Sequence, residues 1–284
     1  MEKYVVVTGV SSGIGRGIAR DLVGRGYKVF GSVRKEADAQ SLKDQLGDHF
    51  FPLLFDVTNP EAIASAVSQV SEVVGQQGLA GLINNAGISV TGPLMHLRME
   101  EIRSLFEVNV LGVIGVTQAF LPLLGAREDS PHPPGRVINI SSVSGAFAAP
   151  FLGAYAGTKH ALEAVTQGFR RELKIYGIDV SAIEPSFIRT EMFQKNATQV
   201  SEARFSDTGY SNLWGAFLDS FAKTERKAAS VDRVAAAVHD ALTRRKPKTR
   251  YPLDPIWWIS GVLSDRQFDR LIFKAMGIEK ALSD

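Results

Sequence analysis

Short stretches rich in β-branched residues alternate with helix-like stretches along most of the chain, and this alternation limits the fold more than any other feature. Six stretches have the length and composition of buried strands: Tyr4–Val7, Lys28–Val33, Phe51–Val57, Leu79–Asn84, Arg136–Ser141 and Asp179–Glu184. Between them, apolar residues recur every three or four positions, as on one face of a helix. Such βαβ units build a parallel sheet with helices on both faces, so the sequence predicts an α/β fold with a doubly wound sheet.

The domain organisation follows from where this regularity holds. It fails between about residues 186 and 230, where aromatic residues lie in a polar, turn-prone sequence, and it returns in a helix predicted over Val231–Thr243. No internal repeat or low-complexity tract interrupts the chain. We therefore expect one domain over residues 1–284, with an insertion at about 186–230 and a C-terminal tail at about 254–284.

Composition excludes several classes of function. Lys and Arg total 32 against 30 Asp and Glu, so charge gives no global case for nucleic acid as a partner. The absence of cysteine excludes disulfides, thiolate metal sites and a Cys nucleophile. The five histidines show no metal-ligand spacing, and no metal is expected.

Membrane insertion and export are not expected either. The N-terminus leads directly into Val5–Val7 without a signal-type apolar segment. The longest strongly apolar run beyond the predicted core, Ile256–Leu263, is far shorter than the ~20 residues that span a bilayer. A cytoplasmic protein without a transmembrane segment is the expectation.

A glycine-rich turn, Thr8–Gly15, lies between the first strand and the first helix. Glycines let a backbone turn tightly and approach a ligand, and the following helix N-terminus offers free N–H groups to a phosphate. The turn therefore predicts nucleotide binding by its residues Gly9, Ser11, Ser12, Gly13, Ile14 and Gly15. No Gly-Lys-Ser/Thr follows, so nucleoside triphosphate hydrolysis is not expected.

The same turn also fits a hydrolase. Gly9-Val10-Ser11-Ser12-Gly13 matches the G-x-S-x-G pattern in which a serine nucleophile sits between a strand and a helix. That chemistry needs an acid and then a histidine later in the chain. Only His239 comes late, and it lies in an ordinary amphipathic helix. A serine hydrolase is thus the weakest of the three functions considered.

Three residues downstream have the chemistry of alcohol–carbonyl interconversion. Tyr155 and Lys159 are four apart at the start of a predicted helix, so their side chains share one face. An adjacent ammonium favours the phenolate and would lower the pKa of Tyr155, making it a proton carrier near neutral pH. Ser142 ends the fifth predicted strand and would place a hydroxyl beside a carbonyl oxygen.

With these residues included, the sequence resembles the short-chain dehydrogenase/reductase family in its single-domain form, of the hydroxysteroid and retinol dehydrogenase kind. The matching motifs are Thr8-Gly9-x-x-x-Gly13-x-Gly15, Asn84-Asn85-Ala86-Gly87, the Ser142 region and Tyr155-x-x-x-Lys159. The resemblance implies a Rossmann-type fold and NAD(P)-dependent oxidation or reduction. It covers about residues 3–190 well and the remainder loosely.

The resemblance also implies roles for individual residues. The catalytic set is Asn109, Ser142, Tyr155 and Lys159, with Asn109 supporting a water chain to Lys159. Besides the turn, the cofactor set is Arg34, Asp56, Val57, Asn85, Ala86, Gly87, Tyr155, Lys159, Pro185, Ile188 and Thr190. Two positions have open alternatives: Asn109 as a buried asparagine bonded to backbone at a helix bend, and Asp56 as an ordinary turn residue.

The residues at the end of the second predicted strand indicate which dinucleotide binds. In the family, an acidic residue that accepts hydrogen bonds from the ribose of NAD falls eighteen residues after the last glycine of the turn. That position here is Val33, followed by Arg34 and Lys35, whose charges suit a 2′-phosphate. NADP is therefore predicted as the cofactor, with NAD as the alternative.

The substrate segment is apolar. Met192, Phe193, Phe205, Tyr210, Trp214 and Phe217 fall within residues 187–221, which close over the substrate in the family. A pocket for a bulky apolar alcohol or carbonyl, such as a steroid, retinoid or lipid-like molecule, is one interpretation. A lid that only packs on the core is the other. We expect a homodimer or homotetramer, and a non-catalytic dinucleotide sensor is the alternative function.

Overall fold

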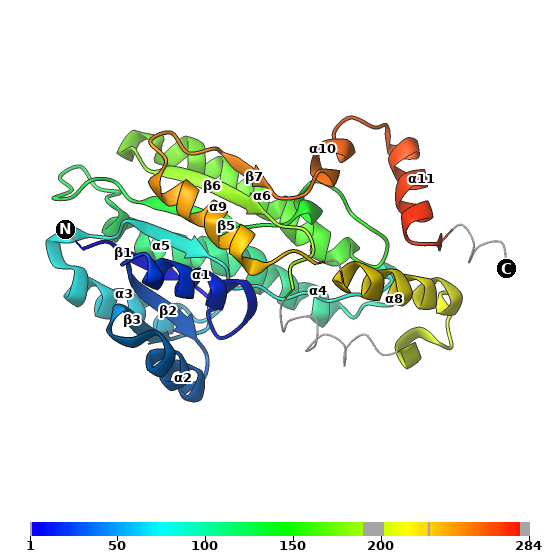
Figure 1. Cartoon of the computed structure of the whole chain (residues 1–284), viewed down its shortest axis with the longest axis horizontal. Helices are drawn as coiled ribbons and strands as arrows, with labels where there is room; N and C mark the ends of the chain where they lie inside the picture. Colours follow the sequence, from blue (N-terminus) through cyan, green and yellow to red (C-terminus); the bar gives the residue numbers. More distant parts are fainter. Residues whose placement is uncertain (1, 190–201, 227, 279–284) are drawn as a thin grey trace.

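The computed structural model describes residues 2–189, 202–226 and 228–278. These residues contain a seven-stranded sheet in which all neighbouring strands are parallel, in the order β3-β2-β1-β4-β5-β6-β7 (Figure 1). The strands are β1 (Tyr4–Val7), β2 (Lys28–Val33), β3 (Phe50–Leu54), β4 (Gly81–Asn84), β5 (Arg136–Ile140), β6 (Asp179–Glu184) and β7 (Arg250–Pro252). The predicted doubly wound α/β fold is confirmed.

Helices flank the sheet on both faces (Figure 1). The helices of the described residues are α1 (Gly13–Gly24), α2 (Glu36–Leu46), α3 (Pro60–Val74), α4 (Met99–Phe106), α5 (Gly112–Phe120), α6 (Gly153–Glu172), α8 (Ser211–Arg226), α9 (Val231–Thr243), α10 (Ile256–Ser260) and α11 (Asp265–Ala275). Of these, α8, α10 and α11 lie beyond one end of the sheet (Figure 1). The sequence patterns did not predict α2, α8, α10 or α11. In α2 only Ala39 and Leu42 are buried, which leaves too sparse an apolar pattern to recognise.

Alternation along the strands produces two separate cores. Val5 and Val7 of β1 point to one face and pack with apolar residues of α1 and α9. Tyr4 and Val6 point to the other face and pack with apolar residues of α3 and α5. Because successive side chains of a strand face opposite ways, a strand covered on both sides is apolar at every position. This is why Tyr4–Val7 shows no polar alternation.

The predicted long helix over Met99–Leu121 is not continuous. A π-helical turn, Glu107–Leu111, separates α4 from α5, and a 3₁₀ turn, Leu121–Leu124, follows α5. Asn109 lies inside the π turn, and its side chain hydrogen-bonds the backbone of Ile88 instead of pointing to solvent. π turns of this kind occur often at functional sites.

Residues Met99–Leu124 are long and apolar enough by composition to cross a membrane. In the fold this stretch is part of the α/β layer, and 44% of its most apolar window is buried. Val116 and Phe120 are fully buried in the core that covers one face of the sheet. Packing against the sheet therefore accounts for its hydropathy.

The sequence patterns predict six strands and miss the seventh, β7. β7 pairs with the end of β6, and Arg250 at its start forms ion pairs with the buried Glu163 and Glu184. Each edge strand contains a proline, Pro52 in β3 and Pro252 in β7, where a missing N–H removes no ladder hydrogen bond.

The aromatic residues of the insertion form a core of their own. Phe205, Trp214 and Phe217 are buried against one another and against Phe151, which precedes α6. The Trp214 and Phe217 rings stack with centroids 5.3 Å apart. Phe151 has a φ of 66°, an unusual conformation for a bulky residue, and its carbonyl accepts a hydrogen bond from Gly92. The cluster thus attaches α8 to the segment that leads into α6.

We expect Trp214→Ala to destabilise the protein by about 3–5 kcal/mol, because it empties the centre of this cluster. Trp258→Ala is the matched control, since that indole is 62% exposed, and its effect should stay below about 1 kcal/mol. Urea unfolding followed by circular dichroism measures both. Equal losses for the two variants would show that the cluster does not stabilise the fold.

Candidate active site

The segments singled out in the sequence meet at one edge of the sheet. In a parallel sheet all carboxyl ends lie at the same edge, so the segments that follow β1, β4, β5 and β6 converge there. Strand order reverses between β1 and β4, the position where doubly wound folds bind ligands. The glycine turn, the Asn84–Gly87 segment and Ser142 all follow strands at this edge.

The glycine turn has the backbone that its sequence predicts. Gly9 and Gly13 have φ of 69° and 58°, which side chains rarely adopt. A Cβ on Gly15 would collide with the carbonyl oxygen of Gly9 and the amide of Asn85. These three glycines therefore place no side chain in the turn. We call the backbone that lines the turn at Gly9, Gly13 and Gly15 the cradle.

Two residues that sequence analysis did not place in the site hold this cradle. The Thr8 hydroxyl accepts hydrogen bonds from the N–H groups of Asn85 and Ala86 at 2.9 and 3.0 Å. Asn85 in turn donates its side-chain amide to the carbonyls of Thr8 and Gly9. The N–H of Gly9 donates to the hydroxyl of Ser32 in β2. Thr8 belongs to the glycine-turn motif, whereas the only sequence signal for Ser32 was a polar residue in an apolar strand.

The start of α1 fits a phosphate. Ser12 is the N-cap residue of α1, and its side chain makes no capping hydrogen bond. A helix without a side-chain cap presents its first N–H groups to an anion, and the helix dipole favours negative charge there. The first turn of α1 contains no acidic residue. Ser11, Ser12 and Ile14 thus lie where the sequence predicts a phosphate contact.

Arg34 follows β2 directly, and its side chain is 74% exposed. Its guanidinium lies 3.7 Å from a carboxylate oxygen of Asp56. Asp56 also accepts hydrogen bonds from the N–H and hydroxyl of Thr58, as a turn residue does. Val57 is buried against the start of α5. The structure therefore gives Asp56 local partners and leaves its predicted adenine contact a prediction.

Ser142, Tyr155 and Lys159 lie together. Ser142 follows β5 and is hydrogen-bonded to Tyr155 near the start of α6. The Lys159 amine lies 5.7 Å from the centroid of the Tyr155 ring and donates to the carbonyl of Ile140 at 2.9 Å. Lys159 is only 6% exposed. The structure thus brings together the three residues that the sequence spacing associated.

The pKa of Tyr155 is raised to about 12, mainly by desolvation, and the hydrogen bond with Ser142 opposes this rise. The pKa of Lys159 is lowered to about 8 by burial, and the charge of Glu163 opposes this fall. The predicted net direction of the Tyr155 pKa shift is therefore wrong: desolvation raises the pKa instead of leaving it lowered. Tyr155 retains its proton throughout the neutral range.

Asn109 links the π turn to α6. Its amide oxygen accepts from the N–H of Ile88, and its amide nitrogen donates to the carbonyl of Ile88 and to the hydroxyl of Thr158. Thr158 itself donates to the carbonyl of Tyr155 at 2.7 Å. This arrangement matches the structural alternative of a buried asparagine at a helix bend, while the predicted water chain remains a prediction.

The segment after β6 also reaches the site. The carbonyl of Pro185 accepts a hydrogen bond from Val143, next to Ser142. Ile188 is buried and forms an isolated parallel β-bridge with Ala229. The two hydrogen bonds of this bridge join Ala229 to the neighbours of Ile188, the carbonyl of Phe187 and the N–H of Arg189. The predicted cofactor residue Thr190 lies outside the described residues.

The elements of a serine hydrolase do not come together. Ser11 lies beyond the carboxyl end of β1, whereas His239 of α9 contacts the ring of Tyr27, which immediately precedes β2. Ser11 is thus near the carboxyl ends of the parallel strands, and His239 is near their amino ends.

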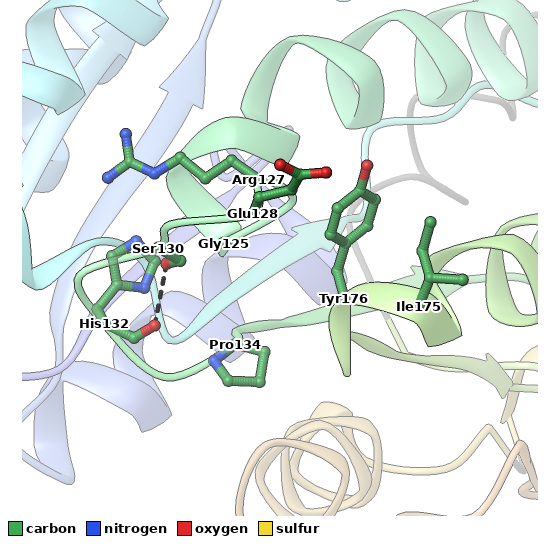
Figure 2. Close-up of a pocket in the computed structure, with 8 residues that line it drawn as sticks. All are labelled: Gly125, Arg127, Glu128, Ser130, His132, Pro134, Ile175 and Tyr176. Carbon is green, nitrogen blue, oxygen red and sulfur yellow. Dashed lines mark hydrogen bonds between the residues drawn. The ribbon is translucent and has the colours of Figure 1, made fainter.

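A pocket of about 410 Å³ also lies away from the motif residues (Figure 2). Its lining comes from the segment before β5 and the turn before β6, and includes Arg127, His132 and Tyr176. These segments approach the amino ends of their strands. The pocket therefore does not belong to the candidate active site.

Comparison with known proteins identifies the family. The short chain dehydrogenase family matches residues 3–201. The chain is 38% identical to the NADPH-dependent 3-dehydrocapnine reductase of Ornithobacterium rhinotracheale over 276 residues, 96% of each chain. It is 35% identical to retinol dehydrogenase 16 of Homo sapiens, over 88% of this chain and 80% of that one. A short-chain dehydrogenase from Streptomyces avermitilis superposes with a TM-score of 0.75 at 26% identity, covering 100% of this chain and 98% of the other. The chain therefore belongs to the short-chain dehydrogenase/reductase family and is an NAD(P)-dependent oxidoreductase.

Proposed function

We propose that this protein is an NADPH-dependent reductase that converts the carbonyl group of a bulky, largely apolar substrate to an alcohol. The observation that carries the proposal is the cluster of Ser142, Tyr155 and Lys159, in which Tyr155 retains its proton and Lys159 is buried beside it. A protonated phenol that is hydrogen-bonded to a serine can serve as the proton donor of a carbonyl reduction.

The residues of the turn fit the dinucleotide. The backbone cradle of Gly9, Gly13 and Gly15 and the uncapped start of α1 would hold the pyrophosphate. Arg34 would hold the 2′-phosphate of NADP, since a planar guanidinium grips phosphate with paired hydrogen bonds. The relative with 96% coverage of each chain is NADPH-dependent by name, which supports the same preference here. When bound, NADPH supplies the hydride.

The protein's own residues handle the proton and the charge of the carbonyl oxygen. Ser142 and Tyr155 would both donate hydrogen bonds to that oxygen, which becomes negative as the carbonyl is reduced. Tyr155 then gives up its proton. Lys159 favours the phenolate that remains, because its positively charged ammonium lies 5.7 Å from the centroid of the Tyr155 ring.

The surroundings of Tyr155 support an apolar substrate. Leu94 is 59% exposed and lies against Gly153, two residues before Tyr155. The aromatic cluster with Phe151 lies just before the same helix, although its described members fill their own core. The similarity to a retinol dehydrogenase supports the same substrate class. Met192 and Phe193, which the sequence also assigned to this wall, lie outside the described residues.

We expect Tyr155→Phe to retain cofactor binding and to lower kcat by about 10²–10⁴-fold, because only the proton donor is removed. Steady-state assays with NADPH give the rate, and quenching of protein fluorescence gives the affinity for NADPH. Wild-type turnover in this variant would show that Tyr155 is not the proton donor.

Arg34→Ala should weaken NADP binding about tenfold or more and leave NAD binding nearly unchanged, since a charge-assisted contact contributes roughly 1.5–3 kcal/mol. Lys35→Ala, the neighbouring charge at the N-cap of α2, is the matched control and should have a smaller effect. Calorimetric titration with both dinucleotides measures the affinities. An equal loss for NADP and NAD would contradict this role of Arg34.

Gly15→Ala should reduce dinucleotide affinity by at least about tenfold, because its methyl group would displace the Gly9 carbonyl and the Asn85 amide. Gly24→Ala is the control in the same helix, where a Cβ meets nothing within 4 Å. That change should preserve binding and stabilise the fold by about 0.5–1 kcal/mol. If both variants bind NADPH as tightly as the parent protein, the cradle does not contribute to dinucleotide binding.

A further inference from the structure

A buried group of three ionisable side chains begins one helical turn after Lys159. Glu163 is one helical turn after Lys159 on α6 and is 4% exposed, while Glu184 ends β6 and is fully buried. Arg250 of β7 contacts Glu163 at 3.0 Å and Glu184 at 3.1 Å. Trp257 of α10 donates its indole N–H to Glu184 at 2.9 Å. Four separate elements thus meet at this charge cluster.

The charge cluster contains two buried carboxyl groups and one guanidinium. Arg250 contacts one oxygen of each, and the other oxygen of each has no N–H or O–H donor among the described residues. Two buried carboxyl groups with one guanidinium between them disfavour two negative charges, so one carboxyl group is driven toward its neutral form. Burial and the charge of Glu163 raise the pKa of Glu184, which favours the neutral form of Glu184. Glu163 is the carboxyl group of this pair whose charge acts on Lys159.

Buried ammonium groups lose their proton unless a negative charge faces them. The groups that face Lys159 are the Tyr155 ring and Glu163 from α6, the Ile140 carbonyl from β5 and the Ser142 hydroxyl partner of Tyr155. Among the described residues, the next ionisable groups beyond Glu163 are Glu184, whose raised pKa favours the neutral form, and Arg250, whose charge is opposed by Glu163. Glu163 is thus the negative charge in this set that favours the ammonium.

We propose that Glu163 is a positioning residue of the reaction: its buried carboxylate, held by Arg250, which also contacts Glu184, keeps the amine of Lys159 charged beside Tyr155. Glu163 does not touch the reacting atoms and acts only through Lys159. The proposal rests on the proposed function, since that function gives the charge of Lys159 its purpose. The cluster also ties this charge to β7 and α10, elements outside the family match of residues 3–201.

The test measures Lys159 directly in the cofactor-free protein. Protein labelled with ¹⁵N-lysine is titrated by NMR, and Lys159→Met assigns the signal. We expect Glu163→Gln to lower the protonation midpoint of Lys159 by about one pH unit. Glu184→Gln is the matched control, an identical change in the same buried pair that removes a neutral carboxyl, and it should leave the midpoint near its original value. Glu163→Asp, which keeps the charge, should restore most of the shift.

Two results would overturn the proposal: an unchanged midpoint in Glu163→Gln, or equal shifts in both glutamine variants. If Glu163→Gln does not fold, the double variant Glu163→Gln/Arg250→Gln removes both partners of the ion pair. The midpoint of Lys159 should still fall in that variant, because the charge of Glu163 is lost. The pH profile of kcat/KM with NADPH then separates this inference from the proposed function. A lowered NMR midpoint with an unmoved pH profile would also overturn the role of Glu163 in the reaction, while the Tyr155→Phe assay decides the proposed function separately.

Discussion

The parallel sheet imposes the arrangement on which the rest of the molecule depends. All its strands end at the same edge, and the order reverses between β1 and β4, so turns far apart in sequence must meet there. The Thr8 hydroxyl joins two of these turns through the N–H groups of Asn85 and Ala86. The Pro185 carbonyl joins two others through Val143. Backbone hydrogen bonds at the edge of the sheet therefore position the site before any ligand binds.

Burial determines the charges of the site. Desolvation raises the pKa of Tyr155 and lowers that of Lys159, so each side chain is driven toward its neutral form. For Tyr155 this favours the protonated phenol, which suits a proton donor. For Lys159 it opposes the ammonium, and the charge of Glu163 counters that effect. The site thus depends on a balance between burial and one neighbouring carboxylate.

The sequence predicted those parts of the molecule that local pattern encodes. Six strands, the glycine turn and the spacing of Ser142, Tyr155 and Lys159 follow from periodicity and motifs. Properties that depend on contacts between distant segments were missed or wrong. Short β7 pairs with β6, and its Arg250 contacts Glu163 and Glu184, each more than 60 residues away in sequence. The direction of the Tyr155 pKa shift depends on desolvation, which no spacing reveals.

The central claim is that this family member reduces an apolar carbonyl compound with NADPH, and loss of absorbance at 340 nm tests it most directly. Purified protein is assayed with NADPH or NADH against a panel of ketones and aldehydes graded from small and polar to bulky and apolar. The account predicts consumption of NADPH that is fastest with bulky apolar ketones and slower with NADH. Tight binding of NADPH without consumption by any carbonyl, or a preference for NADH, would contradict it.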